Sequence, residues 1–552
     1  MASQEPTVLE DRTRAPEAQE GGDPSAADSP AEKKEPSKSA LKKKAQLEAQ
    51  EKKKAAKREQ QAAQEQKEKD ARAALFEEAK KVILQEDTNL PKAVKISIGE
   101  KDPEIIKLRR PDAQQSDDIS DYRGTRVVVH GWVHRLRSQK GVVFITLQDG
   151  SGELQCVLTG QLIKTYQAMT LTRETTMAIY GEMWEVPPKQ HAPDNRELHA
   201  DYYQIDGVAP GDKEAIGTVL APDADPQTFL NHRHLAIRGD TLTSVFKVRS
   251  VVLDAFRQTY REALPRFWEV DPPALVQTQV EGGGTLFQLK LQNGEQAYLT
   301  QSSQLYLETC LRSFGQVFTI QKSFRAEKSL TRRHLSEYTH VEAELSFITF
   351  DDLLTHLEHL MTRVVELTLA DPVIAGYIKT LNPEFQPPTR PFLRMRYADA
   401  IDWLNEHSIV NEDGNPHVFG DDIAEAAERK MTDIINRPIF LTHFPVEIKA
   451  FYMKRDVDDP RVTESVDVLM PGVGEIVGGS MRIRDHDELM AAFEREKIDP
   501  KPYYWYTDQR KYGSCEHGGY GLGLERFLAW MCGQWTVRDC ILYPRFMGRC
   551  TP

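Results

Sequence analysis

The stretch SFRAEKSLTRRHLSEYTHVEAE, residues 323–344, is the most informative part of this 552-residue chain. Its charged residues gather around a short turn: Arg325, Glu327, Arg332, Arg333 and His334. A second stretch, GGYGLGLERFLAW at residues 518–530, places small residues just before a helix that carries Arg526. Guanidinium groups bind phosphate oxygens through paired, charge-assisted hydrogen bonds. A lone arginine more often forms a surface salt bridge, but the two stretches together predict a polyphosphate site.

Neither stretch is a P-loop or a dinucleotide-binding fingerprint. The first resembles motif 2, and the second motif 3, of the class II aminoacyl-tRNA synthetases. A region resembling motif 1 precedes them: an amphipathic helix predicted over 246–262 runs into a segment that ends at the family's characteristic proline, here Pro273. The order and spacing fit the aspartate/asparagine/lysine subgroup, and the resemblance covers residues 120–552.

The resemblance implies an α+β fold, in which an antiparallel sheet flanked by helices forms the catalytic domain. We expect this domain over 236–552, with its motifs at about 246–273, 321–346 and 518–530. Five short strand-like runs with glycine turns precede it and are typical of an OB-type barrel over 120–212. They lie at 126–134, 141–149, 152–158, 176–181 and 202–207. Residues 213–235 have turn chemistry and predict a hinge.

The barrel is expected to bind single-stranded nucleic acid, by stacking bases on aromatic rings and following phosphates with cations. The candidates are Phe144, Arg135, Arg137 and Gln155. In relatives, the matching phenylalanine stacks on the middle anticodon base and the matching glutamine hydrogen-bonds it. Phe144 as an ordinary core residue is the alternative. Because the subgroup's tRNAs share this middle base, the barrel does not choose among them.

The N-terminal part of the chain has an uneven charge. The whole chain has a net charge of −13, residues 1–32 hold eight acids against two arginines, and residues 33–72 hold fourteen Lys/Arg against seven Asp/Glu. Residues 1–36 predict a disordered acidic tail. Residues 37–76 lack Pro and Gly and favour a helix, which is either a solvated, frayed helix or an RNA-binding arm. A linker is expected over 77–119.

The run from Ser37 resembles the Lys-rich RNA-binding motif in the N-terminal extensions of eukaryotic aspartyl- and lysyl-tRNA synthetases. It departs from that motif at Gln46, where a further lysine would stand.

The sequence composition indicates the cellular compartment. No run of eighteen apolar residues exists that could span a bilayer, and the acidic N-terminus lacks the features of a secretory or mitochondrial signal. The six cysteines form no C-x-x-C pair, which is typical of reduced thiols. We therefore expect a cytoplasmic protein, with neither a membrane nor DNA as partner.

The resemblance further implies that ATP activates an amino acid, whose carboxylate attacks the α-phosphate and expels pyrophosphate. Such a reaction needs positioning and positive charge rather than a general base. Arg325 and Arg526 would be catalytic: Arg325 at the α-phosphate and the attacking carboxylate, Arg526 at the β,γ-phosphates. The other ATP-binding positions implied are Glu327, Arg333, His334, Leu335, Tyr338, Glu475, Gly523 and Leu524.

Magnesium prefers oxygen ligands, and Asp467 and Glu475 would provide two carboxylates. Ordinary surface acids are the alternative. Aspartyl relatives often offer a serine where this chain has Gly478. His517 fits either a site position or a structural histidine.

The residues of the pocket indicate which amino acid is the substrate. The resemblance implies that Glu281 binds the α-amino group of the substrate and that Arg482 reaches its side chain. It also places Gln304, Arg325 and Glu342 in the pocket. Aspartyl enzymes have an aspartate at the position of Glu342 and a lysine at that of Leu307, for which plain core packing is the alternative. Arg482 donating to an amide oxygen and Glu342 accepting from its NH₂ group would suit asparagine, because a second carboxylate would be repelled.

The closing RCTP and the HGGYG run at residues 517–521 also resemble the cytosolic asparagine-specific enzymes of eukaryotes. We therefore expect a homodimer, through motif 1, that forms asparaginyl-adenylate and transfers asparagine to tRNA-Asn. The alternatives are an aspartate- or lysine-specific enzyme, an asparagine synthetase relative, which would have no reason to keep the barrel, and a non-catalytic RNA-binding paralogue.

Overall fold

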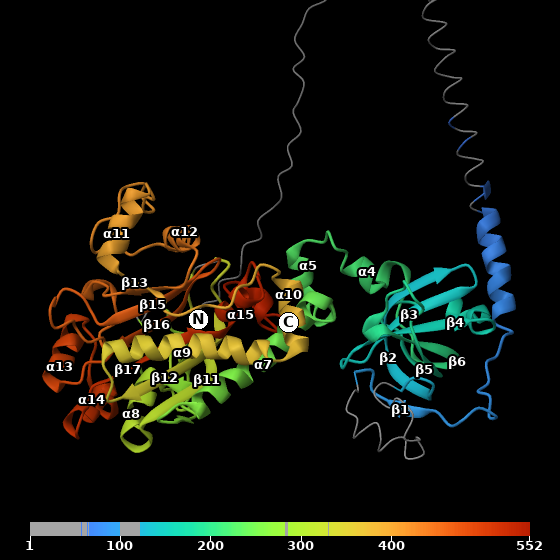
Figure 1. Ribbon diagram of the computed structural model, residues 1–552. Helices are drawn as coiled ribbons and strands as arrows, with labels where there is room; N and C mark the ends of the chain where they lie inside the picture. Colours follow the sequence, from blue (N-terminus) through green and yellow to red (C-terminus); the bar gives the residue numbers. More distant parts are fainter. Residues whose placement is uncertain are drawn as a thin grey trace, which may run out of the picture. The chain divides into compact units, whose positions relative to one another are not determined.

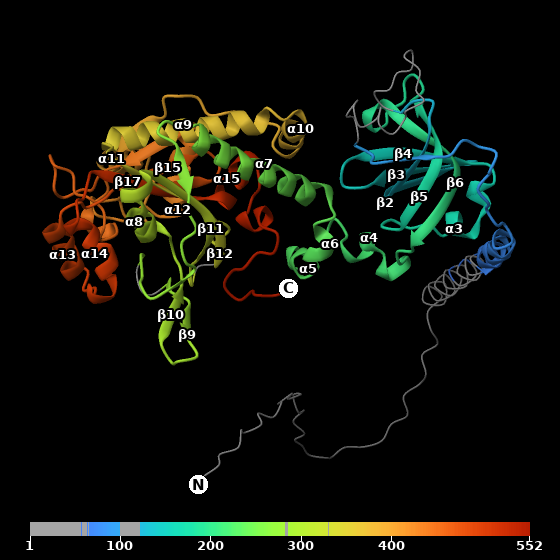
Figure 2. The ribbon, with the colours of Figure 1, turned by 90° about the horizontal axis from the view of Figure 1, so that it is seen from below.

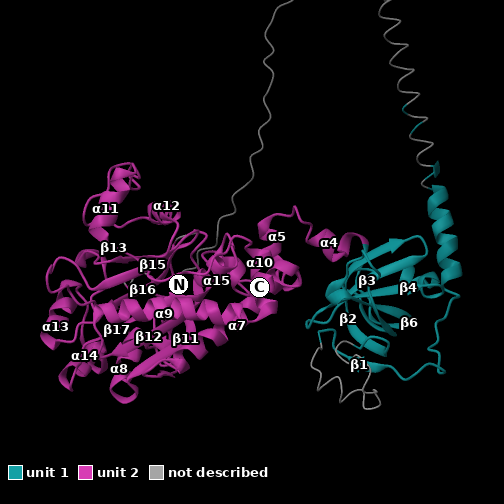
Figure 3. Cartoon of the chain, in the orientation of Figure 1, with its two compact units in different colours: residues 1–211 teal, residues 212–552 magenta. Residues whose placement is uncertain are grey.

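The computed structural model describes residues 54, 57, 63–64, 66–99, 122–281, 285–328 and 331–552. It has two compact units, residues 1–211 and residues 212–552 (Figure 3). The predicted acidic tail and most of the Lys-rich segment lie outside the described residues. In the described part of the chain, no helix has the length and apolar character needed to cross a membrane.

The first unit contains the expected barrel (Figure 1). Its strands are β2 (Arg126–Gln139), β3 (Val142–Gln148), β4 (Glu153–Thr159), β5 (Thr176–Glu185) and β6 (Arg196–Gly207). They pair in the order β2-β3-β4-β6-β5, and β5 returns to β2 and closes the barrel. Alternate residues of β3 are buried, with Ile145 and Leu147 at 0% exposure, so period-two apolar patterning produced this core.

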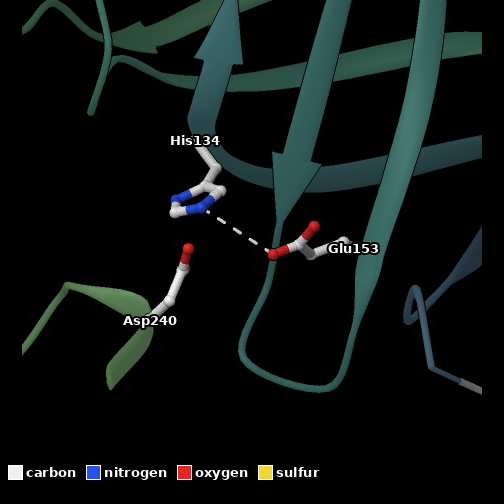
Figure 4. Close-up of side chains that lie close together, drawn as sticks. All are labelled: His134, Glu153 and Asp240. Atoms are coloured by element: carbon white, nitrogen blue, oxygen red, sulfur yellow. Dashed lines mark ion pairs between the residues drawn. The ribbon is translucent and has the colours of Figure 1, made fainter. Parts of the chain in front are cut away.

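Short helical turns connect the barrel strands: η1 (Leu162–Lys164), α3 (Tyr166–Met169) and η2 (Pro193–Asn195). His134 of β2 is buried and its Nε2 lies 3.8 Å from Oε1 of Glu153 on β4, an ion pair visible in Figure 4.

The segment predicted as a linker differs from that prediction. β1 (Val94–Ile96) lies within it and pairs in parallel with β2. Residues 66–79 are helical, as expected for the end of the Lys-rich segment. The helix packs on the barrel through Phe76, whose ring meets Tyr166 edge-on at 5.5 Å, and through the buried Ala79.

The second unit begins with short helices where a hinge was expected: η3 (Asp212–Glu214), α4 (Ile216–Val219), α5 (Pro226–Asn231) and α6 (Arg233–Ala236). The motif 1 helix, α7 (Asp240–Glu262), starts six residues before its predicted first residue. Val248, Val252 and Phe256 recur at helical spacing on its buried face.

An eight-stranded sheet forms the body of this unit, in the order β13-β14-β15-β16-β17-β12-β11-β7. Its strands are β7 (Phe267–Glu269), β11 (Gln316–Phe324), β12 (Glu337–Ser346), β13 (Leu393–Arg396), β14 (Ile439–Thr442), β15 (Ser465–Met470), β16 (Gly474–Met481) and β17 (His517–Gly523). The pairs β13–β14 and β11–β7 are parallel and the others antiparallel.

α7 and α9 (Phe350–Leu369) pack against each other and against one face of this sheet (Figures 1 and 2). A smaller sheet holds β8 (Leu275–Val276), β9 (Gln288–Lys290) and β10 (Gln296–Leu299). The remaining helices are α8 (Gln304–Phe314), α10 (Pro372–Leu381), α11 (Tyr397–Glu406), α12 (Glu425–Ile435), η5 (Val446–Ile448), α13 (His486–Arg495), η6 (Lys501–Tyr503), α14 (Tyr504–Lys511), α15 (Leu524–Met531) and η7 (Val537–Cys540).

Candidate functional site

The site is built on β12, where His340, Glu342 and Glu344 alternate along one face. Their partners on β17 are all glycines: Gly523, Gly521 and Gly519, respectively. A Cβ on Gly521 would stand 2.2 Å from Nε2 of His340, and one on Gly519 would stand 2.2 Å from Oε1 of Glu344. The glycines of motif 3 therefore make room for the polar side chains of motif 2.

These strands border a cavity of about 280 Å³. Almost all the site residues predicted for the second unit line this cavity. They are Glu281, Gln304, Arg325, Glu327, Arg333, His334, Leu335, Tyr338, Glu342, Asp467, Glu475, Arg482, Gly523 and Arg526. Leu524 is the exception. It is fully buried in the hydrophobic core beneath the sheet and does not line the cavity, because α15 begins there and turns its side chain inward.

Arg325 follows the end of β11 and faces Glu281, with Nη2 2.7 Å from Oε2. Its guanidinium also lies 5.4 Å from the ring centre of Tyr338 and Nη1 lies 3.8 Å from Oε1 of Glu327. Burial alone would lower the pKa of Arg325, but the surrounding acidic groups, Glu281 first among them, together outweigh burial and raise it. Arg325 is therefore a fixed positive charge at one end of the cavity.

Arg333 and Arg526 converge on one carboxylate. Nη1 of Arg526 lies 2.9 Å, and Nη2 of Arg333 3.9 Å, from Oε2 of Glu475. Arg333 also pairs with Glu428 at 3.1 Å and with Glu425 at 3.5 Å, both on α12. Burial would raise the pKa of Glu475, but Arg526 and Arg333, with Lys449, together outweigh burial and lower that pKa to about 2.

His334 completes this end of the cavity. Its Nε2 lies 3.7 Å from Oε2 of Glu327, and its Nδ1 is 2.6 Å from the hydroxyl of Thr331. Burial lowers the pKa of His334. Three cationic or hydrogen-bonding side chains, Arg333, His334 and Arg526, thus face one region, as a polyphosphate requires.

The other end of the cavity holds a second arginine–carboxylate pair. Nη2 of Arg482 lies 2.5 Å from Oε1 of Glu344, its Nε donates to the same carboxylate, and its Nη1 donates to the hydroxyl of Ser480 at 2.7 Å. These bonds use three of the five guanidinium N–H groups, so two remain for a ligand.

Glu342 lies beside this pair and is buried. Its carboxylate accepts hydrogen bonds from the hydroxyl of Ser302 and from the backbone N–H of Ser303, the latter at 2.9 Å. Burial raises the pKa of Glu342. Gln304 is held by a donation from its Nε2 to Glu308 at 3.1 Å.

The structure bears on two residues for which the sequence left alternatives open. Leu307 does not line the cavity: it is fully buried with Leu311 and Val317, so it is core packing, the alternative to a selectivity role. His517 is structural, with Nε2 3.0 Å from Oε2 of Glu308 and Nδ1 at the carbonyl oxygen of Cys515.

Sequence reasoning also missed several cavity residues: Ser302, Glu344, Lys449 and Tyr452. Strand alternation could have indicated Glu344, which stands two residues after Glu342. No sequence signal distinguishes Lys449, which reaches the cavity from the turn after η5.

The two predicted magnesium ligands lie together. A Cβ on Gly478 would stand 3.4 Å from Oε1 of Glu475 and 3.5 Å from Oδ1 of Asp467. Lys449 Nζ donates to Asp467 at 2.8 Å. Two carboxylates facing the space above a glycine fit Mg²⁺, which takes one or two protein carboxylates together with substrate phosphates.

On the barrel, the four predicted residues share the outer face. Arg137 pairs with Phe144 across β2 and β3, and its guanidinium lies 4.8 Å from that ring centre. Arg135 and Gln155 both pair with Thr146. Phe144 is partly exposed, which argues against the core alternative.

Three family models match the chain. The one described as "tRNA synthetases class II (D, K and N)" matches residues 225–547, "OB-fold nucleic acid binding domain" matches residues 127–205, and "Asparaginal-tRNA synthetase, N-terminal domain" matches residues 12–91.

Relatives and solved structures agree. The cytoplasmic asparagine–tRNA ligase of Debaryomyces hansenii is 58% identical over 484 residues, 88% of this chain and 84% of that protein. The human cytoplasmic enzyme is 52% identical over 477 residues, 86% of this chain and 83% of that protein. The asparaginyl-tRNA synthetase of Entamoeba histolytica, solved with asparaginyl-adenylate, superposes with a TM-score of 0.75 at 42% identity, covering 84% of this chain and all of that one. This chain therefore belongs to the class II aminoacyl-tRNA synthetases, within the asparaginyl-tRNA synthetase family.

Proposed function

We propose that this enzyme forms asparaginyl-adenylate from L-asparagine and ATP in the cavity described above, and then transfers asparagine to the 3′ end of tRNA-Asn in the cytoplasm. The observation that carries the proposal is that Arg325, Arg333 and Arg526 line the same cavity as Arg482 and Glu342. The first three residues suit a triphosphate, and the other two suit a polar side chain.

In the activation step, the asparagine α-carboxylate attacks the α-phosphorus of ATP, and pyrophosphate leaves. Arg325 neutralises the negative charge of both reacting groups. Arg333, His334 and Arg526 hold the β,γ-phosphates, and Tyr338 stacks on adenine, with Leu335, Gly523 and Glu327 around it. Charged donors fixed before the reaction stabilise developing charge without reorganisation. Mg²⁺ would be held by Asp467 and Glu475 and would neutralise further phosphate charge.

In the amino-acid pocket, Glu281 accepts from the substrate ammonium group. The two unused N–H groups of Arg482 donate to the side-chain oxygen of asparagine, and Glu342 accepts from its NH₂ group. Aspartate would meet Glu342 and Glu344 with a third carboxylate in a buried site, which is strongly unfavourable. Gln304, oriented by Glu308, borders the same space.

The decisive experiment is ATP–pyrophosphate exchange with L-asparagine, L-aspartate and L-lysine in parallel. Exchange with asparagine alone supports both the reaction and the pocket. Exchange with aspartate would overturn the pocket assignment but leave the reaction. Absence of exchange with all three would indicate a non-catalytic paralogue.

The barrel face with Phe144, Arg135, Arg137 and Gln155 is proposed to bind the anticodon of tRNA-Asn, and the Lys-rich segment to add phosphate contacts. Deleting residues 1–72 should weaken tRNA binding and flatten its salt dependence, since fewer counterions are released. A homodimer is proposed through motif 1. In support, Leu264 and Trp268, at the end of α7 and on the edge strand β7, are 96% and 48% exposed. Analytical ultracentrifugation tests this assembly.

A further inference from the structure

The outer face of the barrel carries two cross-strand rows of side chains, which we call the outer rows. The first contains Arg137, Phe144, Val157 and His199, and the second contains Arg135, Thr146, Gln155, Glu197 and Trp184. Directly paired residues point to the same side of a sheet. The rows therefore continue the proposed anticodon-binding face from β2, β3 and β4 onto β6 and β5.

Trp184 is the exposed aromatic residue at the far end of these rows. Half of its surface (50%) is accessible, although burying a tryptophan normally stabilises a fold. Its ring stacks on His199, with centroids 5.2 Å apart and an interplanar angle of 25°. The indole is thus held in a fixed orientation while much of it stays exposed.

A chain of hydrogen bonds joins this pair to Gln155. Nε2 of His199 lies 2.7 Å from Oε1 of Glu197, and Nε2 of Gln155 donates to Oε2 of the same carboxylate at 2.8 Å. Glu197 is 4% exposed and engaged on both oxygens, so its charge is shielded from an approaching phosphate backbone. The stacked pair and Gln155 therefore form one connected surface.

We propose that Trp184, supported by His199, is a second stacking site of the barrel, which takes another base of the same RNA strand that stacks a base on Phe144. The proposal rests on the proposed binding of the anticodon loop by this barrel. Any base has a π-face that an aromatic ring can stack on, so the site selects single-stranded RNA rather than a particular base.

Position and spacing both suit this occupant. Trp184 stands near the end of β5 and His199 near the start of β6, on either side of the loop between the fourth and fifth barrel strands. In OB-folds this loop borders the oligonucleotide-binding face. Trp184 lies on β5, three strands away from Phe144 on β3, about 14 Å at the usual strand separation. That distance is about four times the 3.4 Å step of a stacked nucleic-acid strand, so an RNA strand that crosses this face would place different bases on the two rings.

The test measures the Kd of a stem-loop RNA carrying the tRNA-Asn anticodon, by fluorescence anisotropy at fixed salt, for the full-length protein and the variants W184A, W184F, F144A and W132A. Trp132 is the matched control, because it is 48% exposed on the same barrel but lies outside the outer rows. A lost base–aromatic stack should raise Kd about 5- to 100-fold in W184A. W184F should keep most of the affinity, and W132A should match the unmodified protein.

RNA variants with one abasic position identify the base. On the RNA that lacks the base stacked on Trp184, W184A should not raise the Kd any further, whereas F144A should still raise it. If W184A does not fold, W184L, which is apolar but has no ring face, replaces it.

A Kd for W184A equal to that for W132A, with F144A weakened, would overturn this inference alone. If F144A and W184A both bind like the unmodified protein, the proposed anticodon face is itself wrong. An equal loss for W184A on every abasic RNA would indicate a structural role and also count against the second stacking site.

Discussion

Nη2 of Arg325 lies 2.9 Å from Oε1 and 2.7 Å from Oε2 of Glu281, so the arginine proposed to bind the α-phosphate and the glutamate proposed to bind the α-amino group form one ion pair. The two substrates carry charges opposite to these two groups. An asparagine ammonium group attracts Glu281 and releases Arg325 toward phosphate, and ATP does the reverse. Each substrate should therefore favour binding of the other.

E281Q removes this coupling. The variant should bind ATP alone as tightly as the unmodified enzyme or more tightly, because Arg325 loses its competing carboxylate. Its KM for asparagine should rise at least ten-fold, because an ammonium group loses a charged acceptor. Calorimetric ATP titrations with and without asparagine, together with exchange kinetics, measure both effects.

E295Q is the control, since Glu295 is exposed in the turn between β9 and β10. An E281Q enzyme in which asparagine still tightens ATP binding as before would contradict the coupling.

G519A should disrupt the amino-acid end of the cavity. The new Cβ would stand 2.2 Å from Oε1 of Glu344 and 2.3 Å from the carbonyl oxygen of Ala343, so the strand itself would have to move. We expect asparagine-dependent exchange to fall at least 100-fold, because displacing Glu344 displaces Arg482, and stability to fall by about 1–3 kcal/mol.

G376A provides the contrast. Gly376 lies inside α10 with open space around its Cβ position, so alanine should stabilise the protein by about 0.5–1 kcal/mol. Urea unfolding and exchange assays on the pair distinguish a steric effect at Gly519 from a general effect of losing a glycine.

Arg249 joins the three motifs. From α7 it places Nη1 2.9 Å from Oε1 of Glu525 on α15, and Nη2 donates to the hydroxyl of Thr339 on β12 at 2.6 Å. Glu525 also accepts from the Thr339 backbone N–H at 2.9 Å. R249K cannot keep this forked geometry, and a broken buried pair costs about 3–5 kcal/mol. Because Arg526 follows Glu525, the KM for ATP should rise as well.

R257K on the same helix is the matched comparison. Arg257 pairs with Glu269 at 3.1 Å, but the two side chains are 30% and 44% exposed, so the expected loss is about 0–1 kcal/mol. Equal unfolding free energies for R249K and R257K would remove Arg249 from its linking role.

Much of this architecture could be predicted because its determinants are local. Alternation of apolar residues indicated all five strands of the barrel, and helical spacing indicated α7. The parallel strand β1 could not be found, since three residues in a segment with prolines carry no periodic signal. Its partner β2 supplies the hydrogen bonds that make it a strand.

The site residues that lie within the motifs could be predicted from the sequence. The residues from distant segments that hold them in position could not. Glu428 and Glu425 hold Arg333 from α12, about ninety residues away in sequence, and nothing in their local pattern indicates this. Leu307 is different. The i, i+4 spacing of Leu307 and Leu311 on α8 is typical of a buried helix face, a pattern that was not used to predict their burial.

The buried side chain of His340 predicts that the folded protein loses stability in acid. It is 6% exposed, and burial, with Arg325 next in effect, lowers its pKa from 6.5 to about 3. Below pH 6.5 the unfolded chain binds a proton that the folded protein does not, so stability falls as pH falls from 6.5 toward 3. The slope is about 1.4 kcal/mol per pH unit for one proton. Urea unfolding at pH 7, 6 and 5 should show H340Q losing less stability than the unmodified protein over this range.

The control is H359Q, at an exposed position of α9, which shows the effect of replacing a histidine that does not line the cavity. Parallel curves for H340Q and the unmodified protein would show that His340 does not titrate in this way.

L307K tests the residue whose interpretation changed. Leu307 is fully buried with Leu311 and Val317, and Val270 and Cys310 pack against them. Because these neighbours are apolar, a lysine there would bury its charge among them or lose its proton. We expect stability to fall by several kcal/mol, with the ratio of aspartate to asparagine exchange unchanged in the protein that remains folded.

L289K, at a partly exposed position of β9, should leave both stability and selectivity near those of the unmodified enzyme. The informative measurement is the exchange ratio of the two amino acids below the melting temperature of L307K. A stable L307K enzyme that gains aspartate exchange would mean that the lysine ammonium reaches the cavity from α8. In that case selectivity would depend on Leu307, and Arg482, Glu342 and Glu344 alone would not explain the rejection of aspartate.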